Sequence, residues 1–163
     1  MSQAAEHMNS EPPLDILPMS FDHLEKVLKI EQEAFPHPWK RDDFDYVLNK
    51  PNGYAVVAYR SNLLAGYAAG FFVRQEFHLA SLAIRGEMQC QGLGTFLLSS
   101  IVNRVKDKGS KLITLEVRMS NAPAIALYEK ARFSQVAIRE AYYAHPGEDA
   151  IVMLKRISED PWP

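Results

Sequence analysis

The chain has 163 residues, of which 47% are hydrophobic and 23% are charged, and its net charge is −2. This length suits one domain with a sizeable core, and the near-neutral charge argues against a basic nucleic-acid-binding surface. No apolar run approaches the roughly 20 residues that a membrane helix needs. Because Cys90 is the single cysteine, an internal disulfide is excluded, and we expect a protein of the reducing cytoplasm.

The two ends of the chain differ from its middle. Residues 1–13 are polar and contain no apolar segment of the kind found in secretory signals, so they predict a disordered N-terminal tail. Residues 14–158 are expected to form a single domain, because no repeat, low-complexity block or linker interrupts them. Residues 159–163 are expected to be a C-terminal tail.

The first third of the domain predicts a short strand and two helices. Residues 14–17 are expected to be an edge strand. Ser20 is a suitable N-cap for an amphipathic helix, which the proline-containing run 36–39 must break. A second short helix has apolar side chains on one face over residues 44–48, and the Pro-Asn-Gly sequence at 51–53 ends it.

Strands dominate the next part of the chain. Residues 54–59, 64–73 and 77–84 read as three strands with turn residues between them. Gly66 and Gly70 interrupt the middle strand, which predicts β-bulges or close approaches of a neighbouring backbone.

The last part alternates helices with strands. A long helix is expected to end at Gly109, followed by a strand over residues 111–118. Asn121 is expected to cap a short helix, and two strands follow over 133–139 and 150–157. This order predicts a mixed α/β fold around one sheet, in which the strands that flank the long helix are parallel neighbours.

Two glycines lie where the long helix begins. Gly92 and Gly94 let backbone N–H groups approach an anion, and the helix dipole favours negative charge there. A dinucleotide site would need a third glycine, but position 97 is Leu, and a P-loop would need Lys after its last glycine, where Thr95 follows. An ordinary glycine-containing turn remains an alternative explanation. The run 89–94 resembles the Gln/Arg-x-x-Gly-x-Gly/Ala loop that holds the coenzyme A pyrophosphate in the GNAT acetyltransferases.

Glu116 and Tyr128 are the candidate catalytic residues. A glutamate near the end of a buried strand must be paired or functional, and an ion pair with Arg118 is the simplest alternative. Tyr128 is equally compatible with a packing role. In acetyl transfer, Glu116 would take the amine proton, Tyr128 would donate to the departing sulfur, and backbone N–H groups of residues 82–84 would hold the oxyanion.

The cost of deprotonation favours one kind of acceptor. At pH 7, removing a proton costs about 1.1 kcal/mol for an α-amino group but about 4.6 kcal/mol for a lysine. A single ordinary carboxylate therefore suits an α-amino group better.

A longer resemblance covers about residues 14–155. The run 115–130 resembles the signature of the GNAT branch that acetylates the N-terminal alanine of a small-subunit ribosomal protein. Residues 33–39 resemble the first inter-helix loop of that branch, and residues 139–143 with 148–153 resemble its closing hairpin. The resemblance implies the GNAT fold, with one largely antiparallel mixed sheet, helices on both faces and a parallel strand pair splayed at the cofactor site.

The same resemblance implies acetyl-CoA as the acetyl donor and a protein N-terminus, of a ribosomal protein, as the acceptor. It assigns Glu116 as the base and Tyr128 as the acid. Trp39, Tyr142 and Tyr143 would frame the peptide N-terminus, although simple packing explains these aromatic residues equally well. The expected cofactor-binding residues are Leu82, Ala83, Ile84, Gln89, Cys90, Gln91, Gly92, Leu93, Gly94, Thr95 and Asn121.

Two positions depart from the family pattern. Gln91 stands where relatives often have Arg, which removes one charge from the pyrophosphate site. Arg132 stands where glycine is usual, and a left-handed conformation there would cost on the order of 1–2 kcal/mol. The five histidines show no metal-ligand spacing, so no metal site is expected.

Two other functions remain open from the sequence. A GNAT enzyme acting on a small amine would need further carboxylates at the acceptor site, and Asp42, Asp43, Glu148 and Asp149 are candidates. A catalytically idle acyl-CoA-binding module would not need Glu116. We expect a monomer or weak dimer that binds neither nucleic acid nor membrane.

Overall fold

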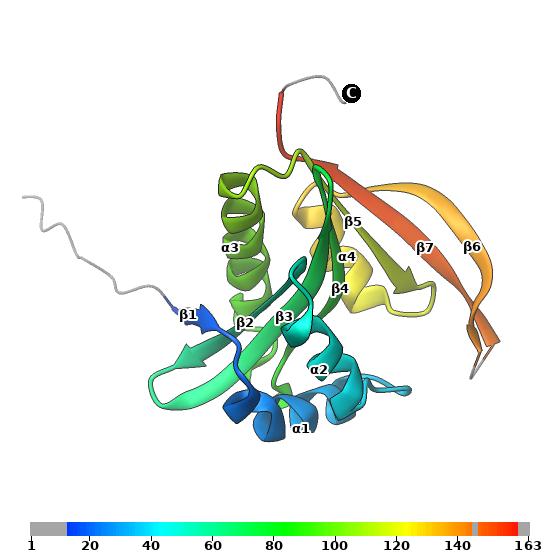
Figure 1. Cartoon of the computed structure of the whole chain (residues 1–163). Coiled ribbons are helices and arrows are strands. Elements are labelled where there is room, and N and C mark those ends of the chain that lie inside the picture. Colours follow the sequence, from blue (N-terminus) through cyan, green and yellow to red (C-terminus); the bar gives the residue numbers. More distant parts are fainter. Residues whose placement is uncertain (1–12, 145–146, 160–163) are drawn as a thin grey trace, which may run out of the picture.

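One seven-stranded sheet organises the computed structural model, which describes residues 13–144 and 147–159 (Figure 1). The strands are β1 (Asp15–Pro18), β2 (Gly53–Arg60), β3 (Leu63–Val73), β4 (Glu76–Ile84), β5 (Leu112–Arg118), β6 (Ser134–Ala144) and β7 (Gly147–Arg156). The helices are α1 (Leu24–Ala34), α2 (Arg41–Asn49), α3 (Leu93–Asp107) and α4 (Ala122–Lys130), with 3₁₀ turns at Phe21–His23 and Gly86–Met88. The predicted tails, 1–13 and 159–163, lie outside the described residues, apart from Pro13 and Glu159.

The strand order is β1-β2-β3-β4-β5-β7-β6, and β4–β5 is its parallel pair. This confirms the predicted fold class, the edge position of β1 and the parallel strands that flank α3. Parallel pairing joins Glu76–His78 to Leu112–Thr114 and extends no further along these strands in the described part of the chain. The carboxyl-terminal parts of β4 and β5 therefore diverge, as expected for a ligand site between them.

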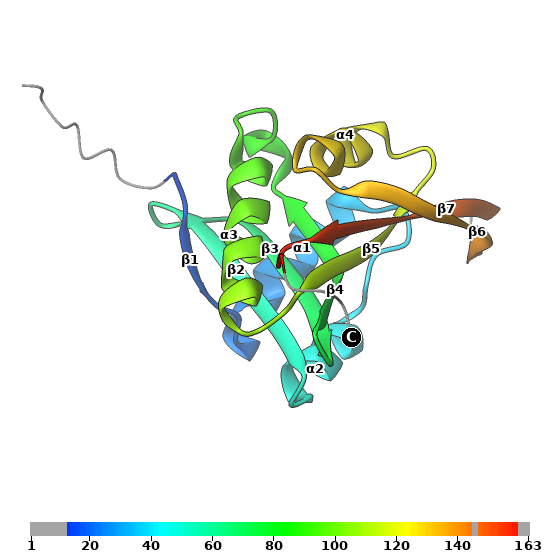
Figure 2. The same ribbon diagram turned by 90° about the horizontal axis from the view of Figure 1, so that it is seen from above.

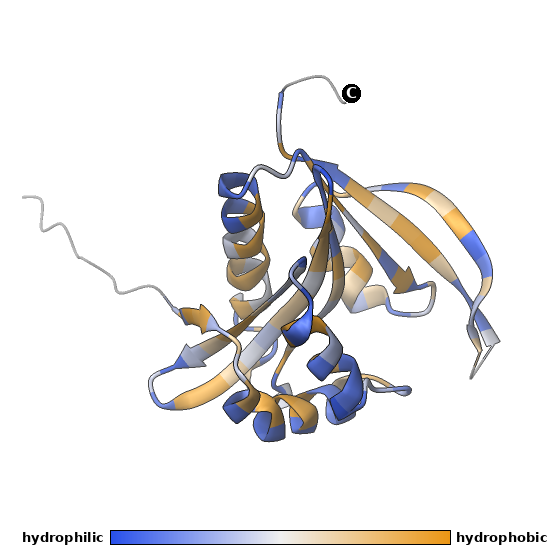
Figure 3. Cartoon of the chain, in the orientation of Figure 1, coloured by the Kyte–Doolittle hydropathy of each residue, from blue (hydrophilic) through white to orange (hydrophobic). Residues whose placement is uncertain are grey.

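The helices cover both faces of the sheet, as Figure 2 shows from above. One buried cluster joins the inner side of α3 to the sheet, and another joins α1 and α2 to the opposite face. Figure 3 shows the same division on α3, whose apolar side faces the strands and whose polar side faces outward. In residues 13–144 and 147–159, no helix is long and apolar enough to span a bilayer.

Both predictions for the glycines of β3 are confirmed. The register between β3 and β4 shifts between Ala69 and Gly70, which marks a bulge. A Cβ atom at Gly66 would lie 2.5 Å from the carbonyl oxygen of Ala83, and one at Gly70 would lie 2.2 Å from that of His78. The backbone of β4 therefore approaches β3 too closely for a side chain at either position.

The last hairpin is longer than the sequence predicted. Pairing of β6 with β7 continues past Arg139 to Tyr143↔Glu148 after an irregularity, so both strands extend beyond the predicted 133–139 and 150–157. Most of the added residues are exposed, although Tyr143, Glu148 and Asp149 are half-buried, and cross-strand pairing rather than an apolar pattern maintains this part. Arg132 has φ = 68°, so the strained conformation that glycine usually adopts there is present.

Candidate active site

A cavity of about 720 Å³ opens where β4 and β5 diverge. Its wall includes the loop between α1 and α2, the turn before α3, the start of α4 and part of β6. The predicted site residues that line it are Trp39, Leu82, Ala83, Ile84, Gln89, Cys90, Gly92, Gly94, Thr95, Glu116, Asn121, Tyr128 and Tyr143. Its volume is typical of a small-molecule site.

The turn before α3 forms one end of the cavity. Cys90 and Gly92 both have left-handed backbone conformations, with φ of 60° and 78°. The side chain of Gln89 donates to the carbonyl of Ile84 at 3.0 Å and so joins this turn to the end of β4. The first N–H groups of α3 therefore point into a preorganised turn, which suits a phosphate group.

Two predicted cofactor residues of this turn do not line the cavity. Leu93 is buried in the core beneath α3, so only its backbone is near the turn. Gln91 accepts a hydrogen bond from the guanidinium of Arg60 at 2.6 Å and donates to the carbonyl of Glu87 at 3.4 Å. Arg60 thus brings a positive charge to the turn whose usual arginine is missing. No feature of the sequence predicts this contact, because Arg60 ends a distant strand.

Glu116 lines the other end of the cavity, and its side chain is only 11% exposed. Its carboxylate is 3.0 Å from Nε2 of His78 and 3.6 Å from the guanidinium of Arg139. The hydrogen bond with His78 is the main reason that the pKa of Glu116 is lowered, and the charges of His78 and Arg139 add to it against the opposing effect of burial. Glu116 is therefore an ionised acceptor at neutral pH.

The simplest alternative for Glu116, an ion pair with Arg118, is wrong. Arg118 pairs with Glu148 at 3.3 Å, and its guanidinium lies 4.1 Å from the ring centroid of Tyr143. Both partners belong to the part of the β6–β7 hairpin that the resemblance to the family's closing hairpin indicated but the apolar pattern did not. The hairpin thus holds Arg118 and leaves Glu116 to face His78.

Tyr128 faces the cavity from α4 and is only 8% exposed. Its ring meets that of Phe133 edge-on, with centroids 5.6 Å apart. Burial raises the pKa of Tyr128, so its phenol remains protonated and is a hydrogen-bond donor. Burial, reinforced by neighbouring Tyr142, likewise raises the pKa of Tyr143 to about 12. Asn121 caps α4, as predicted, by accepting from the N–H of Ala124 at 3.2 Å.

Glu31 is a buried carboxylate of the cavity wall that the sequence reasoning missed. It is 2% exposed, and it accepts hydrogen bonds from the backbone N–H of Trp39 at 3.0 Å and the hydroxyl of Ser81 at 3.1 Å. Burial raises the pKa of Glu31, although these hydrogen bonds oppose the shift. A signal was available, because Glu31 follows Leu24 by seven residues on the apolar stripe of α1.

Glu31 thereby fixes the predicted acceptor residue Trp39, whose ring also packs edge-on against Phe44 at 5.1 Å. Tyr143 lines the cavity, but Tyr142 is 48% exposed and does not. The ring of Tyr142 instead contacts Tyr143 edge-on, with centroids 5.0 Å apart.

The further carboxylates expected for a small-amine site, Asp42, Asp43, Glu148 and Asp149, do not line the cavity, whereas Glu31 does. Asp43 accepts from the N–H of Lys40 at 2.8 Å, and Asp149 accepts from that of Ala141 at 2.8 Å. Glu148 accepts from Ser120 and pairs with Arg118. Within residues 13–144 and 147–159, no group of three His, Cys, Asp or Glu side chains lies close enough to hold a metal ion. His7 and His145 lie outside the described residues.

Comparison with known proteins identifies the family. Residues 24–133 match the family model described as the acetyltransferase (GNAT) family. The chain belongs to the GNAT acetyltransferase family. This confirms the resemblance inferred from the glycine turn and the Asn121–Tyr128 helix, and makes the chain a GNAT acyltransferase.

Two curated relatives of this GNAT enzyme are named as [ribosomal protein bS18]-alanine N-acetyltransferases. The one from Salmonella typhimurium is 35% identical over 143 residues, covering 86% of this chain and 95% of the relative. The one from Escherichia coli (strain K12) is 37% identical over 132 residues, covering 79% of this chain and 88% of the relative.

Solved structures agree with these relatives. The crystal structure of the ribosomal-protein-S18-alanine N-acetyltransferase from Escherichia coli has a TM-score of 0.83 at 33% identity and covers 91% of this chain and 96% of that one. Arabidopsis thaliana NAA60 in complex with acetyl-CoA has a TM-score of 0.79 at 17% identity, covering 88% and 98%, and shares the fold.

Proposed function

We propose that this GNAT enzyme transfers the acetyl group of acetyl-CoA to the N-terminal α-amino group of a protein, namely the N-terminal alanine of ribosomal protein bS18. The observation that carries the proposal is that Glu116 and Tyr128 face one cavity together with the turn before α3. Relatives at 35% and 37% identity that are named for this activity support the choice of acceptor. The cytoplasm, where ribosomal proteins are made, is the proposed location.

The donor end of the cavity fits acetyl-CoA. The left-handed turn at Gly92 and the start of α3 would hold the pyrophosphate, with Arg60 adding positive charge beside Gln91. The diverging end of β4 presents the backbone of Leu82–Ile84, which would bind the pantetheine arm and the thioester oxygen, and Asn121 would contact the opposite side of the arm. Acetyl-CoA supplies the activated acetyl group when bound.

Glu116 would act as the base. It is ionised at neutral pH because His78 and Arg139 lower its pKa, so it can accept the proton of the incoming ammonium directly or through a water molecule. A lowered pKa makes Glu116 a weak base, which suits an α-amino group, since that group needs only about 1.1 kcal/mol for deprotonation at pH 7.

Tyr128 would act on the leaving group. Full proton transfer from an ordinary tyrosine to a thiolate is uphill by about 2 kcal/mol, and burial of Tyr128 increases that difference. Tyr128 would therefore stabilise the developing thiolate mainly through a strong hydrogen bond.

The acceptor would enter beside Trp39 and Tyr143, which line the cavity. A peptide N-terminus is the preferred acceptor, because Asp43, Glu148 and Asp149 hold neighbouring backbone instead of facing the cavity. Glu31 does line the cavity, but its carboxylate already accepts from Trp39 and Ser81. We propose a monomer or weak dimer that binds neither nucleic acid nor membrane.

The test is acetyl-CoA turnover, followed by thiol release, against two sets of acceptors. One set holds short peptides with free N-termini, including the N-terminal sequence of bS18 beginning with alanine, each with an N-terminally blocked control. The other set holds polyamines and amino sugars. Activity on free peptides that disappears on blocking is the expected result. Turnover with small amines alone would refute the acceptor assignment but not the family.

A further inference from the structure

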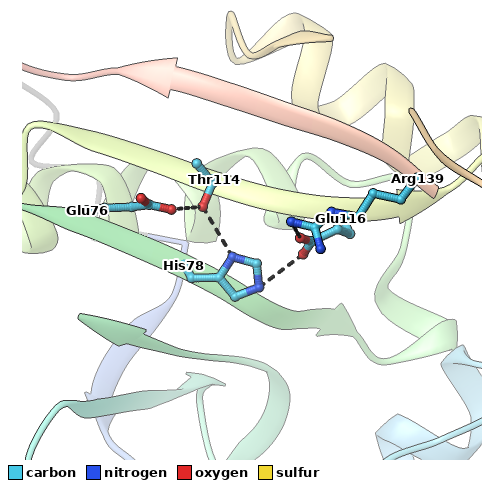
Figure 4. Close-up of polar contacts among 5 residues, drawn as sticks. All are labelled: Glu76, His78, Thr114, Glu116 and Arg139. Carbon is cyan, nitrogen blue, oxygen red and sulfur yellow. Dashed lines mark hydrogen bonds and ion pairs between the residues drawn. The ribbon is translucent and has the colours of Figure 1, made fainter. Parts of the chain in front are cut away.

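A chain of polar contacts runs behind Glu116 along the α1–α2 face of the sheet, as Figure 4 shows. We call it the relay array, and it consists of Glu76, His78, Thr114 and Glu116. The hydroxyl of Thr114 donates to the carboxylate of Glu76 and lies 3.2 Å from Nδ1 of His78. Nε2 of His78 lies 3.0 Å from the carboxylate of Glu116. The array joins β4 to β5 where their parallel pairing ends.

Counting hydrogens shows what the relay array can hold. Its three contacts need one hydrogen each, but the hydroxyl of Thr114 and a neutral imidazole supply only two. With both carboxylates ionised, the third hydrogen is an additional proton, and the imidazole then donates from both nitrogens. All three contacts can therefore be hydrogen bonds at once only when one further proton is held between His78 and Glu116.

The contacts of Thr114 with Glu76 and with His78 determine which tautomer the imidazole adopts when that proton leaves. Because the single hydrogen of Thr114 points to Glu76, the oxygen of Thr114 accepts from Nδ1–H of His78. The neutral imidazole then presents the lone pair of Nε2 to Glu116, so the hydrogen bond that lowers the pKa of Glu116 exists only while the array holds its proton. The array is thus arranged to accept a proton from Glu116.

We infer that Thr114 and Glu76 hold the imidazole of His78 in this form so that it takes over the proton that Glu116 removes from the acceptor amine. This inference rests on the proposed function, in which Glu116 is the base. Glu116 would return to its ionised form after each transfer, ready for the next acceptor. His78, Thr114 and Glu76 are positioning residues, because they act through Glu116.

The reaction requires a path by which one proton leaves the site. An acceptor that enters as an ammonium loses two protons when its nitrogen becomes an amide. One proton ends on the released thiol, whose sulfur Tyr128 protonates or stabilises with a hydrogen bond. The other proton must leave the site. In the relay array that proton passes from the Glu116 carboxyl to Nε2 of His78 and then to water, which reaches the side chain of His78 because it is 31% exposed.

The charges around His78 favour this transfer. On its own strand Glu76 contributes a carboxylate through Thr114, and on β5 Glu116 contributes another. From β6, Arg139 lies 3.6 Å from Glu116 and opposes a positive charge on His78. On the same strand, burial and then the nearby charge of Glu116 raise the pKa of Tyr142. Two carboxylates against one guanidinium leave the array net negative before it binds the proton.

The first test compares Thr114→Val with Thr114→Ser across a pH series with a saturating free peptide. Thr114→Val removes the hydroxyl at nearly constant volume. We expect it to lower kcat about ten-fold, a part of the roughly 10²–10⁴-fold that general base catalysis supplies, and to move the acidic limb of the kcat profile. KM for acetyl-CoA should not change. Thr114→Ser should restore both kcat and the limb, whereas Glu76→Gln should shift the limb in the same direction as Thr114→Val.

The second test observes the imidazole directly by ¹⁵N NMR of the whole protein without substrates. In the wild type, neutral His78 should carry its hydrogen on Nδ1, and in Thr114→Val the hydrogen should move to Nε2 and point to Glu116. An acidic limb that is the same in Thr114→Val and wild type, or a wild-type imidazole with its hydrogen on Nε2, would overturn the inference. A wild type inactive on all free N-termini would instead refute the proposed function, and the NMR result would still stand as a separate test of the array.

Discussion

The donor end and the acceptor end of the cavity are built in different ways. The donor end comes from one nearly continuous stretch, residues 82–95, and presents mainly backbone from β4 and the start of α3. The acceptor end combines side chains that are far apart in sequence, such as Glu31, Glu116 and Tyr143. A site for the shared donor can therefore be recognised from a short sequence motif, whereas the acceptor site depends on which distant side chains the fold brings together.

The largest expected effect is at Glu116, where the two ends meet. Glu116→Gln should lower kcat on a free peptide by about 10²–10⁴-fold, because it removes the proposed base but keeps the shape of the side chain. KM for acetyl-CoA should stay unchanged, since the donor end is intact. Steady-state kinetics with varied donor and acceptor measures both quantities.

Glu140→Gln is the matched control, because it makes the same change at an exposed position of β6. It should behave as the wild type. If Glu116→Gln kept full activity, Glu116 would not be the base, and the assignment of the acceptor end would have to change.

Tyr128→Phe should have the next largest effect. Loss of the phenol would remove the proposed hydrogen bond to the departing sulfur. We expect kcat to fall about 10- to 10²-fold, near the lower end of values for losing a donor to developing charge. The apolar contact with Phe133 is preserved, so the unfolding temperature should not change. Tyr46→Phe, at an exposed position of α2, serves as control. Equal kcat for Tyr128→Phe and Tyr46→Phe would show that Tyr128 has only a packing role.

Glu31→Gln tests whether peptide binding at the acceptor end can be changed without changing acetyl-CoA binding at the donor end. The amide can still accept from the N–H of Trp39, but the cavity wall loses a negative charge that favours an ammonium. We expect binding of the peptide to weaken by on the order of 1 kcal/mol, seen as a higher KM for peptide, with KM for acetyl-CoA unchanged. Glu33→Gln, an exposed position of the same helix, is the control. A change in KM for acetyl-CoA instead would contradict the division into two ends.

The same variant has a predicted pH dependence of stability. Burial raises the pKa of Glu31 in the folded state above its unfolded value of about 4.3. The wild type therefore loses stability as the pH rises from the unfolded to the folded pKa of Glu31, because folding must then bury a charge. Glu31→Gln has no charge to bury and should not show this loss. Urea unfolding should show that the variant gains relative to the wild type from pH 4 towards neutrality. A gain that shrinks with rising pH would show that the sign is wrong.

Arg60→Ala should give the smallest effect, and at the donor end. Removing the guanidinium beside Gln91 should raise KM for acetyl-CoA about two- to five-fold, because exposed ion pairs contribute about 0.2–1 kcal/mol. The effect should decrease with added salt, and KM for peptide should not change. Arg156→Ala, at the exposed end of β7, is the control. An effect of equal size in both variants would show that only net charge matters.

The sequence by itself determined the order of the helices and strands, the glycine turn before α3 and the cap at Asn121. Each of these depends on residues within one or two turns of the chain, whose backbone preferences and apolar spacing are local properties. The predicted roles of Glu116 and Tyr128 followed from resemblance, and the structure adds that both face one cavity.

Only the tertiary structure decided the partners of the charged side chains. The sequence offered Arg118 as the neighbour of Glu116, but the extended β6–β7 hairpin holds Arg118 with Glu148, and the parallel pairing of β4 with β5 brings His78 to Glu116 instead. Arg60 reaches Gln91 for the same reason, across a separation of 31 residues. Ion pairs form between whichever side chains the register of the strands brings within a few ångströms, and that register is a property of the whole sheet.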